Sequence, residues 1–188
     1  MNELKQAISG NKLGEEWILK GNSGQKTNVQ RTMEINPEIN SLEQIADLIC
    51  IFSKTPLWSN ILQSQFKRLG FKTSVCFPDF TSMLTYIMHG IRDDSLGKYA
   101  LAVGNPDIAE FLIPWENMKR QVMDDKIRVL LEGIPVFFMM EHWKDVDPLL
   151  AKAYGKRCIL VYNDTIYTNQ RKVIQVLKSM EDKRSVEN

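Results

Sequence analysis

The chain has 188 residues, 44% of them hydrophobic, and its 24 basic and 23 acidic residues give a net charge of +1. This length and hydrophobic content predict one domain with a sizeable core, plus an extension. The balanced charge indicates no basic stripe of the kind that nucleic-acid-binding proteins carry, so we expect no nucleic-acid partner. The longest apolar runs are far shorter than the roughly 20 residues that cross a bilayer, and the polar first residues do not resemble a signal peptide. We therefore expect a cytoplasmic protein without a membrane partner.

Residues 1–40 differ in composition from the rest of the chain, because Asn, Gly, Ser and Gln are dense there. This composition predicts a flexible or partly ordered N-terminal extension, with a folded subdomain as the alternative. Trp17 belongs to a small apolar run, and an exposed Trp is costly to leave in water, so it could also dock onto the body or onto a partner. Ser41 and Gln44 have the chemistry of a capping box and predict one helical turn before the first strand.

From residue 48 the chain alternates between apolar strands and helices. Leu48–Phe52 is an unbroken apolar run, which is typical of a strand buried on both faces, and Pro56 is well placed to start a helix. The first strand is expected at 48–53 and the first helix at 56–69. The remaining strands are expected at 73–77, 99–103, 134–140 and 157–161, and the remaining helices between Asp79 and Gly90, over 107–131 with a break near Pro114, at 146–154 and at 169–182.

This alternation predicts the fold class. Strands without polar alternation, separated by helices, indicate a parallel sheet covered by helices on both faces. Right-handed crossovers favour a doubly wound, five-stranded, flavodoxin-like α/β domain with strand order 2-1-3-4-5. We assign this domain to residues 41–182 and a charged tail to residues 183–188. In such folds, ligands bind at the carboxyl ends of the strands.

The predicted strand ends carry little that resembles enzyme chemistry. The loop Ser53–Thr55 lacks a glycine-rich phosphate motif, although its hydroxyl groups could hydrogen-bond a phosphate. Asp107 suits the N-terminus of a helix, where the macrodipole favours a negative charge. Glu141 and His142 could form half of a metal site, which would need two or three converging ligands, or could belong to a solvated loop.

The other reactive residue types point to structural roles. The three cysteines, Cys50, Cys76 and Cys158, are odd in number and lie inside apolar runs, so we interpret them as reduced core residues. No Ser lies in a nucleophile elbow, and the adjacent acids at 93–94 and 124–125 are typical of solvated surfaces. We therefore expect no catalytic residue, no metal and no cofactor, and we predict that the protein is not an enzyme.

Three motifs point to a known family. Phe52–Leu57, leading to Lys67–Phe71, has the form of a strand, a short loop, a proline and a helix that closes in a Leu-Gly-aromatic turn. Gly133–Val136 and Gly155–Val161 have the form of entries to a fourth and a fifth strand. With these motifs in this order, residues 47–182 resemble the receiver domain of bacterial response regulators. The resemblance implies the same fold and a phosphorylation pocket at the strand ends.

The residues that the resemblance would place in this pocket depart from the family pattern. Because acids that bind Mg²⁺ are missing and a lysine adds a positive charge, the pocket should repel the metal that phosphoryl transfer requires. The degenerate positions are Ser53 and Lys54 in place of the two acids, Gly104 (or Asn105, one residue on) in place of the phospho-accepting aspartate, Met140 at the Thr/Ser switch, and Tyr162 in place of the lysine after strand five.

The sequence thus predicts a pseudo-receiver, a non-phosphorylated receiver-like module for protein–protein interaction in bacterial signalling or regulation. Its expected partner is another protein or a second copy of the chain. The resemblance implies that partners bind the face made by the fourth helix, the fifth strand and the fifth helix, and aromatic residues are enriched at interfaces. Candidate residues on this face, unless they only cover the core, are Trp143, Tyr154, Tyr162 and Tyr167.

Two alternatives belong to other functional classes. One is a flavodoxin-like enzyme or a protein that binds a small ligand or nucleotide in a strand-end pocket around Ser53, Lys54 and Asn105. An open pocket would favour this alternative, and a pocket filled by Lys54, Met140 and Tyr162 would count against it. The other is a DNA-binding regulator, which would need an output domain for which neither terminus has room.

Overall fold

The computed structural model describes residues 46–95 and 98–186. The chain divides into two units, Met1–Ile35 and Asn36–Asn188, and every described residue belongs to the second. The expected extension over 1–40, Trp17 and the turn at Ser41–Gln44 lie outside the described residues. Among the helices that are described, none is long and apolar enough to cross a membrane.

The described strands form one parallel sheet in the order β2-β1-β3-β4-β5, which confirms the predicted doubly wound α/β fold. β1 lies inside the sheet between β2 and β3, so that Cys50 pairs with Val75 on one side and with Leu101 on the other. The strands are β1 Leu48–Phe52, β2 Thr73–Phe77, β3 Tyr99–Gly104, β4 Val136–Met140 and β5 Ile159–Val161.

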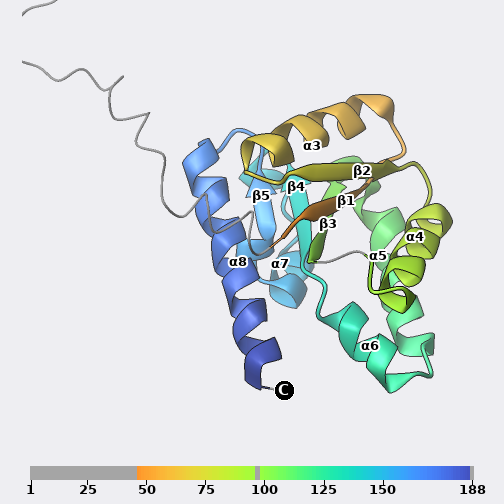
Figure 1. The fold of residues 1–188 in the computed structure, drawn as a ribbon. Helices are drawn as coiled ribbons and strands as arrows, with labels where there is room; N and C mark the ends of the chain where they lie inside the picture. The colour runs from red at the N-terminus through yellow and green to blue at the C-terminus, as the bar shows by residue number, and fades with distance from the viewer. Residues whose placement is uncertain (1–45, 96–97, 187–188) are drawn as a thin grey trace, which may run out of the picture. The chain divides into compact units, whose positions relative to one another are not determined.

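Helices cover both faces of this sheet (Figure 1). One face packs against α3 (Pro56–Arg68) and α8 (Ile166–Val186). The other face packs against α4 (Phe80–Arg92), α5 (Ile108–Gln121), α6 (Asp125–Glu132) and α7 (Pro148–Tyr154). Three short 3₁₀ turns complete the described elements, η3 at Asn105–Asp107, η4 at Trp143–Asp145 and η5 at Lys156–Cys158.

The alternating side chains of β1 reach both halves of the core. Ile49 and Ile51 pack with residues of α3 and α8, whereas Cys50 and Phe52 pack with residues of α4 and α5. All four are buried, and full burial of a large apolar side chain stabilises a fold by about 1.5–3 kcal/mol. Burial also raises the pKa of the Cys50 thiol to about 12, so Cys50 is an unreactive core residue.

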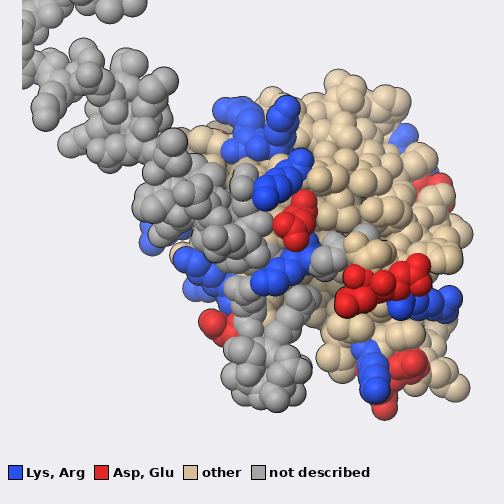
Figure 2. Space-filling model, in the orientation of Figure 1, with Lys and Arg blue, Asp and Glu red and all other residues tan. Residues whose placement is uncertain are grey.

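Charged side chains are distributed unevenly on the face in Figure 2. Lys and Arg side chains gather near the end of α3 that lies next to α8, and both signs are mixed over other parts of this face. Lys67 and Arg68 occupy the last turn of α3, where the helix dipole favours positive charge. The Gln170 side chain of α8 donates a hydrogen bond to the Arg68 carbonyl at 3.3 Å and ties the two helices together.

The expected end of a helix at Gly90 is wrong, because α4 continues to Arg92. Gly90 is buried, and an interior glycine costs a helix only about 1 kcal/mol relative to alanine. The remaining residues of α4 carry a clear apolar face, with Met83 and Ile87 buried in the core. Burial of this face therefore outweighs the local cost of the glycine.

The expected break near Pro114 is also wrong. α5 passes through Pro114, and the break lies at Val122, whose backbone is extended with a ψ of 114°. The Asp124 side chain then caps α6 by accepting hydrogen bonds from two backbone N–H groups of its first turn. Phe111 and Trp115, which flank the proline, are buried and hold this part of α5 against the sheet.

Several other boundaries shift by two or more residues. β4 begins at Val136 instead of 134, and β5 begins at Ile159 because the preceding residues form η5. α7 begins at Pro148 rather than 146, since the Asp147 side chain caps it by accepting the N–H of the second helical residue. α8 starts at 166 and extends to 186, so residues 183–186 of the expected tail are helical.

Pro114 generates a stability prediction. Proline has no N–H for the carbonyl four residues earlier and its ring crowds that carbonyl, so Pro114→Ala should raise the free energy of unfolding by about 1–3 kcal/mol in urea denaturation. The control is Pro148→Ala, because Pro148 stands in the first turn of α7, where its missing N–H costs nothing. A Pro114→Ala protein no more stable than the parent would contradict this account.

Candidate functional site at the strand ends

Ser53 follows β1 and is buried by the chain around it. Its N–H donates a hydrogen bond to the Phe77 carbonyl at 3.1 Å, and its hydroxyl donates to the Thr55 carbonyl at 3.2 Å. The backbone and the side chain are therefore both engaged in holding the turn between β1 and α3. This placement gives Ser53 a structural task at the position where the resemblance implies a metal-binding acid.

Lys54 is linked to the segment that follows β3. Its backbone N–H donates a hydrogen bond to Asp107 Oδ2 at 3.2 Å, and its Nζ lies 2.6 Å from Glu110 Oε2. The hydrogen bond and the negative charge of Glu110 raise the pKa of Lys54. Lys54 was expected to add a positive charge to the pocket, but in the structure Glu110 neutralises that charge.

Asp107 and Glu110 are site residues that the sequence reasoning missed. Asp107 was expected only at a helix N-terminus; it does precede α5, but its side chain is 4% exposed and accepts no hydrogen bond from that helix. The sequence contained a signal for this contact, because the predicted strand order 2-1-3-4-5 places the loop after β1 beside the loop after β3. Residues at i and i+3 of a helix start share one face, so both acids can reach Lys54.

Gly104 ends β3 beneath the Trp58 side chain of α3. A Cβ atom at this glycine would lie 3.0 Å from Trp58 Cε3 and 3.4 Å from Leu62 Cδ1, which is closer than side chains normally pack. The space above Gly104 is thus filled by the tryptophan ring. Of the two residues proposed for the phospho-acceptor position, Asn105 is the one that lines a cavity.

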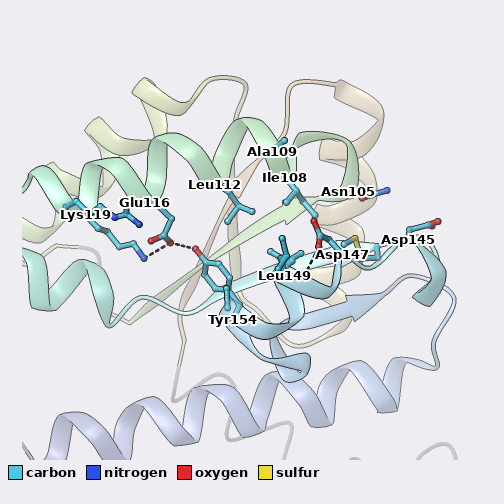
Figure 3. Close-up of a pocket in the computed structure, with 14 residues that line it drawn as sticks. Asn105, Ile108, Ala109, Leu112, Glu116, Lys119, Asp145, Asp147, Leu149 and Tyr154 are labelled. Atoms are coloured by element: carbon cyan, nitrogen blue, oxygen red, sulfur yellow. Dashed lines mark hydrogen bonds and ion pairs between the residues drawn. The ribbon is translucent and has the colours of Figure 1, made fainter.

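That cavity is a groove of about 700 Å³ between α5 and α7, here called the α5–α7 groove (Figure 3). One end holds acidic and amide groups near the strand ends, the other end holds charged residues of the last turns of α5, and the middle is apolar. The lining residues used below are Asn105, Asp145 and Asp147 at the first end, Glu116, Lys119 and Arg120 at the other, and Ile108, Ala109, Leu112, Leu149, Leu150, Ala153 and Tyr154 between them, with Met140 at the floor.

Tyr154 forms part of the wall of this groove. Its hydroxyl donates a hydrogen bond to Glu116 Oε1, and Lys119 Nζ lies 2.7 Å from the same carboxylate oxygen. Burial, together with the hydrogen bond to Glu116, raises the pKa of Tyr154. Burial acts to raise the pKa of Glu116 as well, but the hydrogen bonds from Lys119 and Tyr154 outweigh it, so that this pKa is lowered. The ring meets Phe138 edge-on, with 4.9 Å between centroids.

The other aromatic residues of the expected interaction face are exposed. The exposed fractions are 46% for Trp143, 44% for Tyr162 and 58% for Tyr167. Trp143 is held in place, because its Nε1 donates a hydrogen bond to Asp164 at 3.3 Å and Lys172 Nζ lies 4.2 Å from its ring centroid. Of the four candidates, these three are exposed at the surface, and Tyr154 packs into the α5–α7 groove.

A smaller cavity of about 300 Å³ lies between α3 and the loops after β4 and β5. Leu57, Trp58 and Ile61 line it on one side, and Tyr162 lines it on the other. The adjoining loops are joined by the Asn163 side chain, which donates to the Glu141 carbonyl at 3.3 Å and lies 3.1 Å from His142 Nδ1. Within the described ranges, no three His, Cys, Asp or Glu side chains come together as a metal site would require.

The structure therefore separates the positions that the sequence grouped at the strand ends. Asn105 and Met140 line the α5–α7 groove, Tyr162 lines the smaller cavity, and the Lys54 side chain pairs with Glu110. Lys54, Met140 and Tyr162 do not fill one common pocket. The trio named for the small-ligand alternative is also divided, because only Asn105 among Ser53, Lys54 and Asn105 lines the groove.

Comparisons with protein-family models, with curated proteins and with solved structures gave no match to this chain.

The Tyr154–Glu116 hydrogen bond generates a pH-dependent prediction. Tyr154→Phe should lower the free energy of unfolding at neutral pH by about 1–2 kcal/mol, because a hydrogen bond to a charged carboxylate is lost. A lowered pKa in the folded state adds stability above the unfolded-state pKa of about 4.3, and this contribution disappears as pH falls through the folded-state value. The difference between variant and parent should therefore shrink as the pH falls below the unfolded-state pKa and the Glu116 carboxylate becomes protonated in the folded state as well.

Urea denaturation of both proteins across this pH range measures the effect. The control is Tyr162→Phe, since no hydrogen bond to the Tyr162 hydroxyl is found among the described residues. A difference for Tyr154→Phe that stays constant from neutral to acidic pH would refute the assigned pairing with Glu116.

Proposed function

We propose that this chain is a receiver-like protein-interaction module that works without phosphorylation. The observation that carries the proposal is the set of exposed aromatic residues Trp143, Tyr162 and Tyr167 around the ends of β4 and β5 and the start of α8. The sheet order 2-1-3-4-5 is compatible with a receiver-like domain, although many unrelated functions share that order. The exposed side chains, and not the fold, therefore support this function.

The strand-end chemistry supports the first half of the proposal. Phosphoryl transfer to a protein requires an acceptor and a divalent cation that neutralises the developing charge. At the end of β1, the ammonium group of Lys54 already neutralises Glu110, and the buried Asp107 carboxylate accepts the Lys54 N–H. Above Gly104, the Trp58 ring lies 3.0 Å from where a Cβ atom would stand, so an acceptor side chain there would require the ring to shift.

The aromatic residues support the second half. Interfaces are enriched in Trp and Tyr, which supply large contact areas with few rotatable bonds. The hydrogen bond to Asp164 and the Lys172 ammonium group fix the Trp143 ring, so binding would cost little additional side-chain entropy there. Lys172 also pairs with Asp164 at 3.3 Å, which completes a rigid support behind Trp143.

The absence of phosphorylation can be tested directly. We expect no phosphoryl adduct when the full chain is incubated with acetyl phosphate and Mg²⁺ and analysed by intact-mass spectrometry. The physical reason is that the expected acceptor position offers Gly104 or the amide of Asn105, and neither side chain can form an acyl phosphate. A phosphorylation-competent receiver domain serves as the positive control. A stable adduct on this chain would refute the first half of the proposal.

The interaction face is tested with a double variant. Tyr162→Ala combined with Tyr167→Ala should reduce recovery of specific partners from lysate of the native host by about tenfold or more, a change that corresponds to the loss of one aromatic hot spot. Tyr86→Ala is the matched control, because Tyr86 is 37% exposed but lies on α4, over the other face of the sheet. Circular dichroism checks that the variants are folded. Unchanged partner recovery by the double variant would refute the assigned face.

A further inference from the structure

Large apolar side chains are exposed on the outer face of α6 and on the segment just before it, in a patch that we call the tip. The exposed fractions are 94% for Met123, 54% for Val129 and 47% for Leu130. Residues at i, i+3 and i+4 of a helix share a face, so Lys126 lies on the same face as Val129 and Leu130. The opposite face of α6 packs against the core through the buried Leu131. The tip therefore combines exposed apolar side chains with the cation of Lys126 and the ion pair between Asp125 and Arg128.

The α5–α7 groove offers a surface of the opposite shape. Ala109 on α5 and Ala153 on α7 are small and exposed, so the groove stays open between the two helices. Leu112 and Leu149 provide apolar walls, and Leu149 is 74% exposed although it belongs to the groove lining. A leucine with this exposure gains considerable burial if another apolar surface covers it.

The charges of the tip and the groove are complementary. Asp145 and Asp147 lie together at one end of the groove, and each uses a single carboxylate oxygen to cap a backbone N–H group. No Lys or Arg of the described chain forms an ion pair with either carboxylate. Lys126 of the tip likewise forms no ion pair with a described residue. Docking of the tip into the groove would therefore bring a cation to two acids while burying apolar side chains on both surfaces.

We propose that a second copy of this chain occupies the groove. The tip of each copy docks into the α5–α7 groove of the other, and the two contacts are related by a two-fold axis. The two-fold axis makes the tip–groove contact twice, so the dimer buries double the area of one contact; stable interfaces bury roughly 1,200–2,000 Å² in total. The contact uses none of Trp143, Tyr162 and Tyr167, so this dimer and the proposed partner face can fail independently.

Sedimentation equilibrium of the full chain, up to about 0.5 mM, tests the dimer. Leu149→Asp in the groove and Leu130→Asp in the tip should each weaken dimerisation by about tenfold or more, because each places an unpaired charge in both contacts. Leu57→Asp is the matched control, since Leu57 is 69% exposed on α3, outside the tip and the groove, and should leave dimerisation unchanged. Circular dichroism verifies folding, and Val129→Asp replaces any tip variant that fails to fold.

Mixing the two variants distinguishes the reciprocal contact from other dimers. The Leu149→Asp protein retains a complete tip, and the Leu130→Asp protein retains a complete groove. A mixed dimer therefore has one intact contact, whereas each variant alone has none. We expect the mixture to associate at least about tenfold more tightly than either variant by itself. No gain on mixing would overturn the tip-in-groove arrangement.

Other occupants of the groove would give different results. A chain that remains monomeric over the whole concentration range overturns the proposal. A dimer that neither Leu149→Asp nor Leu130→Asp weakens also overturns it, and places self-association on another surface. Native mass spectrometry of the purified chain supplies an independent readout. A small molecule retained by the parent protein and lost from Leu149→Asp would assign the groove to a ligand and refute the second copy as its occupant.

Discussion

The burial of β1 on both faces is the constraint on which the rest of the structure depends. A strand surrounded by neighbours and covered on each side has no solvent-facing positions, so Ile49, Cys50 and Ile51 must all be apolar. Parallel neighbours require crossover connections, and these place α3 on one face and α4 to α7 on the other, while α8, which follows β5, covers the same face as α3. The same crossovers bring the ends of β1 and β3 together, where Lys54 meets Asp107 and Glu110.

This constraint explains why the fold could be predicted from the sequence and several boundaries could not. Apolar runs such as Leu48–Phe52 report burial of a whole strand, so the strand order followed from alternation and handedness. The positions of helix ends depend on free-energy differences that are smaller than the burial of a whole strand. A buried glycine and an interior proline each cost a few kcal/mol at most, and the packing of Phe111 and Trp115 outweighs the penalty of Pro114. Gly90 and Pro114 therefore did not end their helices, because tertiary packing outweighed their local cost.

The candidate site was less predictable because its residues come from separate segments. The sequence located Lys54 at a strand end, but its partners lie 53 and more positions away, as the Lys54–Asp107 hydrogen bond shows. Tyr154 was grouped with the exposed aromatics because its type and region were suitable. Its orientation depends on α7 packing beside α5, where Glu116 accepts its hydroxyl. The α5–α7 groove itself had no sequence signal, since it results from the distance between two helices and from the small size of Ala109 and Ala153.

Under the proposed function, two features of the strand ends disfavour phosphorylation. One is the packing of side chains there, and the other is the absence of the metal-binding acids. The Cβ atom of an aspartate in place of Gly104 would lie 3.0 Å from Trp58 Cε3, so the Trp58 ring, which lies over the end of β3, would have to shift. An acid in place of Lys54 would leave the carboxylates of Asp107 and Glu110 without their cation and would add like charges at short range. In the chain as it stands, Lys54 neutralises Glu110, so this pair of side chains offers no net negative charge to a metal. A domain that lacks this chemistry can keep its fold and use its outer surfaces for binding, and this chain exposes large apolar side chains on more than one of them.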